Sequence, residues 1–136
     1  MSRVSPAKLI ICEATPRWAV LMRRFARELP ISEARSLALA DDILRDNPGS
    51  AIAVAVTDAN AADVLLKLSQ WQRGDPNCAT AALLDNANAD LELGLREAGA
   101  QLVIASLFEL PLLAQLVRRQ RNVEARRVSE EWSIPR

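Results

Sequence analysis

The sequence contains no histidine and no tyrosine. Without histidine it cannot form a Ser-His-Asp or Cys-His catalytic group, a histidine-ligated metal site or a phosphohistidine. It also has only four glycines, and none of them lies in a strand-to-helix loop of the phosphate-binding kind: Gly49, Gly74, Gly94 and Gly99. Neither a Walker loop nor a GxGxxG fingerprint is present. We therefore expect no enzyme activity and no cofactor.

An excess of charge of one sign is lacking too, because 17 basic residues balance 17 acidic residues. This balance gives no reason to expect binding to nucleic acid or to a membrane. The apolar runs are too short to span a bilayer, and the start of the sequence does not have the layout of a signal peptide. We therefore expect a cytoplasmic protein. Cys12 and Cys78 lie beside apolar segments, which favours reduced, partly buried thiols.

What the sequence does contain is a regular alternation of short apolar runs with longer segments of helical period. A chain of 136 residues, 50% of them hydrophobic, is long enough for one domain with a core. The predicted strands lie at 8–12, 31–36, 51–56, 80–84 and 102–105. The predicted helices comprise 37–46, about 59–73, 89–99 and about 109–131, preceded by one whose apolar face is Trp18, Leu21, Met22, Phe25, Ala26 and Leu29.

Most of these strands are apolar on both faces, as is typical of parallel strands covered by helices on both sides. Right-handed crossovers then predict a three-layer, doubly wound α/β fold with a five-stranded parallel sheet. The weakly apolar segment 31–36 belongs at an edge of that sheet. We expect one domain, 1–136, in which 118–136 forms an extended basic helix and tail.

One segment resembles a known family. Glu97-Ala98-Gly99-Ala100, followed by an apolar strand and Phe108, is similar to the region of response-regulator receiver (CheY-like) domains that leads into the fifth strand and a Lys-Pro-Phe sequence. "KLIICE" (8–13) resembles the first receiver strand with its acidic end, and "ADVLLKLSQW" (62–71) resembles the third helix. The resemblance covers nearly the whole chain and implies the flavodoxin-like (βα)5 fold.

The resemblance also implies a pocket at the carboxyl ends of the strands. In receivers two acidic residues hold magnesium, an aspartate is phosphorylated, and a hydroxyl group and a lysine contact the phosphoryl group. These positions fall on Cys12 and Glu13, on Thr57, on Leu84 and on Ser106. One metal carboxylate and the lysine are missing, so the resemblance implies a degenerate receiver that does not run the aspartyl-phosphate cycle.

Two acidic residues near this pocket need a role. Asp58 is predicted to cap the next helix, with Thr57 and Asn60 as rival caps. The alternatives are that Asp58 or Thr57 is an atypical phosphoacceptor, or that the cleft near Glu13, Thr57 and Ser106 binds a small ligand. Glu13 is predicted to be a solvated loop residue, because a lone carboxylate makes a poor magnesium site.

The last helix carries a basic segment, in which Glu124 is opposed by Arg118, Arg119, Arg121, Arg126 and Arg127. One apolar stripe is predicted to face the sheet: Leu110, Leu113, Ala114 and Val117. A second stripe has no partner within one domain: Leu112, Leu116 and Val123, with Arg119 among them. It is either a solvated overhang or an interface for another protein or a second copy, with Trp132 as a further anchor. We expect a signalling role through protein–protein interaction, and no nucleic acid partner.

Overall fold

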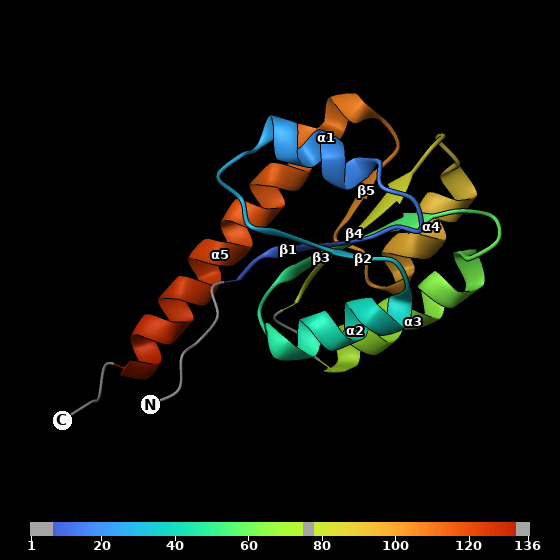
Figure 1. The fold of residues 1–136 in the computed structure, drawn as a ribbon. Coiled ribbons are helices and arrows are strands. Elements are labelled where there is room, and N and C mark those ends of the chain that lie inside the picture. The colour runs from blue at the N-terminus through green and yellow to red at the C-terminus, as the bar shows by residue number, and fades with distance from the viewer. Residues whose placement is uncertain (1–6, 75–77, 133–136) are drawn as a thin grey trace.

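A computed structural model describes residues 7–74 and 78–132, apart from the side chains of 128 and 130–132 (Figure 1). Strands and helices alternate along this part of the chain, as the sequence predicts. The strands are β1 (Leu9–Cys12), β2 (Ile31–Ala34), β3 (Ala51–Val56), β4 (Ala79–Leu84) and β5 (Leu102–Ile104). The helices are α1 (Trp18–Phe25), α2 (Leu37–Asp46), α3 (Ala61–Gly74), α4 (Ala89–Ala98) and α5 (Leu110–Trp132), with a 3₁₀ turn, η1 (Leu107–Glu109), before α5.

The five strands form one parallel sheet in the order β2-β1-β3-β4-β5. The predicted doubly wound fold is thus confirmed, and β2 lies at an edge as expected. β2 is two residues shorter than the predicted segment. It ends at Ala34 because Ser36 turns the chain into α2, where the Ser36 hydroxyl accepts a hydrogen bond from the Leu39 amide at 3.2 Å.

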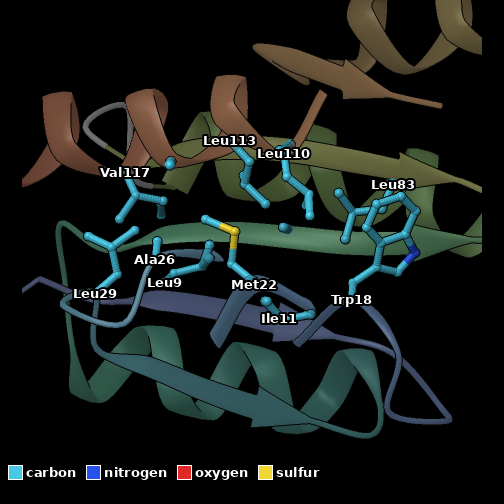
Figure 2. Packing of buried hydrophobic residues seen from close by; sticks show 14 of the residues in the cluster. Leu9, Ile11, Trp18, Met22, Ala26, Leu29, Leu83, Leu110, Leu113 and Val117 are labelled. Atoms are coloured by element: carbon cyan, nitrogen blue, oxygen red, sulfur yellow. The ribbon is translucent and has the colours of Figure 1, made fainter. Parts of the chain in front are cut away.

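Helices cover both faces of the sheet, which gives three layers (Figure 1). Side chains alternate between the two faces along each strand. In β1, Leu9 and Ile11 pack with α1 and α5 (Figure 2), whereas Ile10 and Cys12 pack with α2, α3 and α4. Each face therefore has its own apolar cluster, and the sheet separates the α1/α5 layer from the α2/α3/α4 layer.

The predicted apolar faces of the helices are buried or, at Leu21 and Leu65, partly buried, with one exception. Trp18, Met22, Ala26 and Leu29 lie in the core, but Phe25 is 49% exposed. The prediction for Phe25 is wrong because α1 ends at this residue. The chain then leaves helical geometry at Ala26, so Ala26 and Leu29 pack inward without Phe25.

The last helix contacts the domain well beyond the apolar stripe that was predicted to face the sheet. Leu110, Leu113, Ala114 and Val117 are buried as predicted. One turn further, Gln120 donates a hydrogen bond to the Gly49 carbonyl at 2.8 Å, and Glu124 is buried against Gly49. Residues 118–132 continue the helix, as predicted, but Gln120 and Glu124 do not form the solvated overhang that was one of the two alternatives, because they continue the buried face that apolar residues begin.

Gly49 makes this contact possible. Its φ of +83° is a conformation that glycine adopts without strain, and a Cβ atom at this position would overlap with the Glu124 carboxylate.

Within the described part of the chain, no helix combines the length and apolarity needed to cross a membrane.

Candidate functional site

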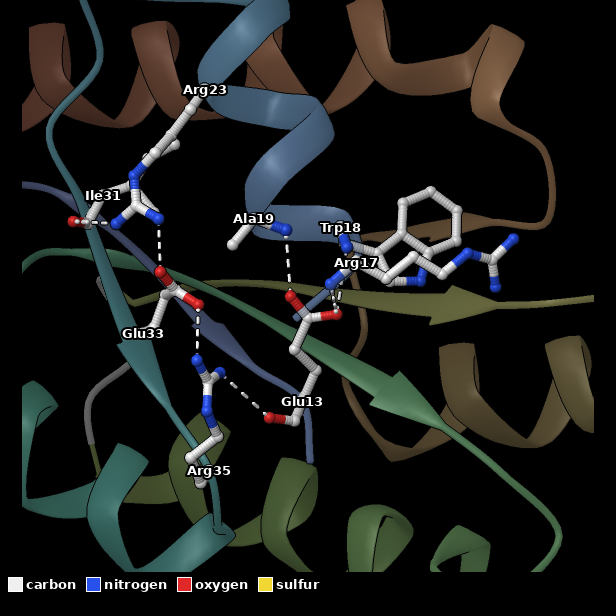
Figure 3. A network of polar contacts seen from close by, with 8 residues as sticks. All are labelled: Glu13, Arg17, Trp18, Ala19, Arg23, Ile31, Glu33 and Arg35. Atoms are coloured by element: carbon white, nitrogen blue, oxygen red, sulfur yellow. Dashed lines mark hydrogen bonds and ion pairs between the residues drawn. The ribbon is translucent and has the colours of Figure 1, made fainter. Parts of the chain in front are cut away.

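Glu13 follows β1 directly, and it is not the solvated residue that the sequence suggests. It is only 4% exposed. Its Oε1 accepts hydrogen bonds from the amides of Arg17 and Trp18 at 3.1 and 3.0 Å, and its Oε2 accepts one from Ala19 at 2.9 Å (Figure 3). The carboxylate therefore caps the amino end of α1, where unpaired amides and the helix dipole favour a negative charge.

This role explains why Glu13 does not fit a metal site. Both carboxylate oxygens accept hydrogen bonds from backbone amides at the start of α1, so a magnesium ion would compete with those amides for the same oxygens. Cys12, where the resemblance implies a second acid, cannot replace a carboxylate as a ligand for this hard cation. Among the residues that the structure describes, no cluster of three acidic or cysteine side chains is placed to hold a metal ion.

The thiol of Cys12 is buried, as predicted. Burial, together with the negative charge of the neighbouring Glu13, raises the pKa of Cys12 to about 11. The thiol is therefore protonated at neutral pH. A protonated, buried thiol is a poor nucleophile and a poor metal ligand.

The turn after β3 is closed by Thr57 and Asn60. The Thr57 amide donates to Asn60 Oδ1 at 2.7 Å, the Asn60 amide donates to Thr57 Oγ1 at 3.3 Å, and Asn60 Nδ2 donates to the Ala55 carbonyl at 3.0 Å. The prediction that Asp58 makes the cap is wrong. The rival residues Thr57 and Asn60 hold the turn that leads into α3, because their side chains bond to the backbone of this turn and to Ala55. Asp58 is exposed, and no described residue donates a hydrogen bond to its carboxylate.

The end of β4 brings a pair of charges that sequence reasoning missed. Leu84 is buried at the end of the strand, and the next residue, Asp85, forms an ion pair with Arg17. The Arg17 guanidinium also lies 5.3 Å from the centre of the Trp18 ring. Arg17 and Asp85 are 68 residues apart in the sequence, so neither composition nor spacing could indicate this contact.

After β5, Ser106 occupies the position of the receiver lysine and caps η1. Its hydroxyl accepts a hydrogen bond from the Phe108 amide at 3.2 Å, while Glu109 accepts one from the Ala105 amide at 3.0 Å. These two bonds hold the turn so that Phe108 points into solvent, where it is 94% exposed. The cation in the same hollow as Ser106 is Arg17, and it is already paired with Asp85.

The predicted pocket residues line three hollows at the carboxyl ends of the strands. Cys12 and Glu13 line one of about 390 Å³, which lies near the start of α2. Thr57, Asp58 and Leu84 line a second of about 300 Å³. Leu84 and Ser106 line a third of about 380 Å³, together with Arg17 and Asp85.

A network of charges beside Glu13 ties α1 to the edge strand (Figure 3). Glu33 on β2 pairs with Arg23 of α1 and with Arg35, and these hydrogen bonds, from Arg23 first and Arg35 second, lower the pKa of Glu33. Arg35 also donates to the Glu13 carbonyl at 3.4 Å. Arg35, the arginine that lines the hollow at Glu13, is thus engaged with Glu33 and with the Glu13 carbonyl.

The second stripe of α5 is exposed in part. Leu112 is 43% exposed and Val123 is 47% exposed, whereas Leu116 packs partly against the domain's own core. The prediction that the domain cannot cover this stripe is therefore wrong for Leu116 only. Arg119, between them, is exposed and has no ion-pair partner among the described residues. The side chain of Trp132 lies outside the described part of the chain.

Solved structures show which fold this is. A response regulator from Thermotoga maritima matches 87% of this chain and 99% of its own, with 17% identity and a TM-score of 0.73. A CheY-like protein (tadZ) from Pseudomonas aeruginosa PAO1 matches 84% of this chain and 98% of its own, with 17% identity and a TM-score of 0.70. The chain has the CheY-like receiver fold.

A response regulator receiver domain protein (CheY-like) from Methanospirillum hungatei JF-1 has the same receiver fold at 12% identity, with 87% of this chain and 98% of that one covered and a TM-score of 0.64. No protein-family model and no curated protein matches the sequence. The resemblance that the Glu97–Ala100 motif indicates is thus confirmed for the fold.

Proposed function

We propose that this receiver-like domain is a regulatory module that acts by binding another protein or a second copy of itself, and that it is neither phosphorylated on aspartate nor an enzyme. The observation that carries the proposal is the position of Glu13. The one acidic side chain left at the receiver's metal position is used to cap α1. Phosphoryl transfer to an aspartate then lacks the metal and the lysine that would neutralise the developing charge.

The exposed stripe of α5 supports binding as the remaining function. Arg118 contacts Glu28 next to α1, so Leu112 and Val123, on the opposite flank of α5, point away from α1. Burying an apolar side chain contributes about 1.5–3 kcal/mol. The costs of association are of a similar size to the sum for this stripe, so we expect self-association to be weak and a complex with another protein to need further contacts.

Phosphorylation is tested by incubation with acetyl phosphate and magnesium, followed by intact mass spectrometry. We expect no stoichiometric adduct. An adduct on Asp58 that is absent from Asp58→Ala would overturn the proposal and establish an atypical phosphoacceptor.

Metal binding is tested by titration with magnesium while tryptophan fluorescence is recorded. Trp18 reports on the site because its amide is bonded to Glu13. We expect no saturable change. Saturable binding that disappears in Glu13→Gln would restore a working receiver pocket.

The interaction surface is tested by sedimentation velocity over a concentration series, with Val123→Glu compared with wild type. Leu66→Glu on α3 is a matched control, because Leu66 is an exposed leucine on the opposite layer. Weak association that is lost in Val123→Glu and kept in Leu66→Glu supports a second copy as the partner. If all three proteins are monomeric, the second copy is excluded, and the stripe either serves another protein or is solvated.

A further inference from the structure

The charges of this neutral chain are sorted by the sheet into two layers. In the α1/α5 layer, arginines outnumber acids: Arg17, Arg23, Arg24 and Arg27 around α1, with Glu13 and Glu28, and Arg118, Arg119, Arg121, Arg126 and Arg127 on α5, with Glu109, Glu124, Glu130 and Glu131. In the other layer, acids dominate the helices: Asp41, Asp42, Asp46, Asp63, Asp90, Glu92 and Glu97 against Arg45, Lys67, Arg73 and Arg96. The balance of 17 and 17 charges therefore hides a molecule with a basic face and an acidic face.

The basic charges of the first layer gather where the end of α1 meets the middle of α5. Ala26 and Leu29 share one apolar cluster with Val117 (Figure 2), which brings the end of α1 to this turn of α5. Next to Val117 and Leu29 in the sequence, Arg118 and Glu28 form an ion pair with each other. Arg121 lies close enough for its charge to lower the pKa of Glu28 further, after the hydrogen bond from Arg118.

Two more arginines, Arg24 and Arg27, lie within four residues of Glu28 in the sequence. Arg24 and Arg27 are exposed, and neither forms an ion pair with any described residue. Phe25 lies between them in the sequence and is 49% exposed. We define the α1–α5 seam as Arg24, Phe25, Arg27, Glu28, Arg118 and Arg121. It holds four guanidinium groups, one carboxylate and one half-exposed aromatic ring.

We infer that the α1–α5 seam binds an acidic segment of a partner protein that also carries an apolar side chain. The carboxylates of the segment would pair with the guanidinium groups, which bind carboxylates in bidentate geometry. Its apolar side chain would cover Phe25, an anchor of the kind that interfaces use. This seam lies on the flank of α5 opposite Leu116 and Val123, so the inference goes beyond the stripe proposed above.

The composition of the seam favours a polypeptide over other anions. A nucleic acid presents phosphates at close, regular spacing, and Glu28 in the middle of the seam would repel some of them. An anionic membrane calls for a larger apolar face than one half-exposed phenylalanine. An acidic polypeptide can place its carboxylates around Glu28 and supply the apolar contact to Phe25.

The test is fluorescence anisotropy with a labelled synthetic peptide in which glutamates surround one leucine, added to the full chain. A matched peptide with glutamine in place of glutamate is the charge control. We expect the acidic peptide to bind and the glutamine peptide not to bind, and the affinity for the acidic peptide to fall as salt is added.

The seam is tested with substitutions in the protein. The three variants Arg24→Gln, Arg27→Gln and Arg121→Gln should each weaken binding of the acidic peptide about two- to fivefold, the range for exposed ion pairs. Phe25→Ser should weaken the binding of the leucine-containing peptide only.

Arg45→Gln and Arg73→Gln, on the acidic layer, are the matched protein controls and should leave binding unchanged. Equal binding by the seam variants and these controls, or no binding of the acidic peptide, overturns the inference. It is also overturned if a DNA duplex or an anionic phosphatidylserine vesicle binds more tightly than the peptide and is sensitive to the same substitutions. The stripe on α5 is tested separately by Val123→Glu, so either surface can fail without the other.

Discussion

Two buried glutamates lie at opposite ends of the sheet, and they solve the same problem in different ways. Glu13, at the carboxyl end of β1, and Glu124, beside the loop that leads into β3, are each 4% exposed. Glu13 is satisfied by three backbone amides of α1. Glu124 lies on Gly49 and is paired with Arg127, whose Nε is 3.2 Å from Glu124 Oε2.

The difference lies in what each carboxylate holds in place. Glu13 accepts hydrogen bonds only from the backbone at the start of α1. The position where receivers carry a metal ligand therefore has a structural role in this chain, as a helix cap. Glu124 carries its countercharge on its own helix and needs a glycine on the facing loop, so it docks α5 against that loop. A buried carboxylate can therefore cap a helix or fix two elements together, and only its partners tell which.

The largest effect is expected from Glu13→Ala, which removes the cap and leaves the amides of Arg17, Trp18 and Ala19 without their acceptor. We expect the free energy of unfolding to fall by about 3 kcal/mol, because a charged acceptor of several amides is lost. Glu13→Gln should cost less, since its carbonyl oxygen can still accept. Urea denaturation measures both, with the exposed Glu97→Ala as control. A loss similar to that of Glu97→Ala would mean that Glu13 is not a structural cap.

A smaller effect, about 2 kcal/mol, is expected from Gly49→Ala, because the new methyl group meets the Glu124 carboxylate and the backbone has a positive φ. In a Glu124→Ala background the same change should cost less, because only the backbone strain remains. The double-mutant cycle therefore measures the contact. Gly74→Ala is the control, since nothing lies near its Cβ position. Additivity of the two changes would break the proposed docking of α5.

Asp41 is a third carboxylate with hydrogen-bonding partners, and its effect on stability should depend on pH. Desolvation opposes ionisation of Asp41, but hydrogen bonds from Lys67 and Trp71 outweigh it and lower its pKa. A lowered pKa contributes stability above the unfolded value of 3.8, and this contribution is lost as the pH falls below it. We expect Asp41→Asn to lower stability by about 1 kcal/mol at pH 7, and the difference from wild type to shrink at pH 3.

Urea denaturation at the two pH values checks the Asp41 prediction. Asp42→Asn is the control, because Asp42 makes only an exposed ion pair with Arg45. If the difference between Asp41→Asn and wild type is the same at pH 3 and pH 7, the ionised form of Asp41 does not stabilise the fold.

The smallest effect concerns Cys12, next to Glu13. Because its pKa is raised to about 11, the folded thiol stays protonated above the ordinary value of 9.0, whereas the unfolded thiol ionises. Stability should therefore decline slightly from pH 9 towards pH 11, and this decline should be absent in Cys12→Ser.

The reactivity of Cys12 is a second measurement. In Cys78→Ser, which leaves Cys12 as the only thiol, native protein at pH 8 should react slowly with a thiol reagent, and unfolded protein should react rapidly. Rapid labelling of the native protein would show that Cys12 is accessible and ionised.

The order and type of the elements follow from the sequence by itself. Strands such as Ala51–Val56 are apolar throughout, and helices such as α3 repeat their apolar residues with helical period, so local pattern determines which element forms. The edge position of β2 follows as well, because its weakly apolar residues suit a strand that is covered less. The resemblance to receivers also implies a degenerate pocket, because the lysine and one carboxylate are missing at the matching positions, Ser106 and Cys12.

The roles of the polar residues were decided by the tertiary structure. Glu13 looks like a loop residue until α1 places three amides around it, and Asp58 looks like a cap until Thr57 and Asn60 close the turn. Arg17 meets Asp85, and Glu124 meets Gly49, across long stretches of sequence. Apolar burial is set by periodic patterns within one element, whereas hydrogen bonds and ion pairs need two particular groups at one distance and angle. Only the packing of the helices on both faces of the sheet supplies that geometry, and it also sorts a neutral chain into a basic and an acidic layer.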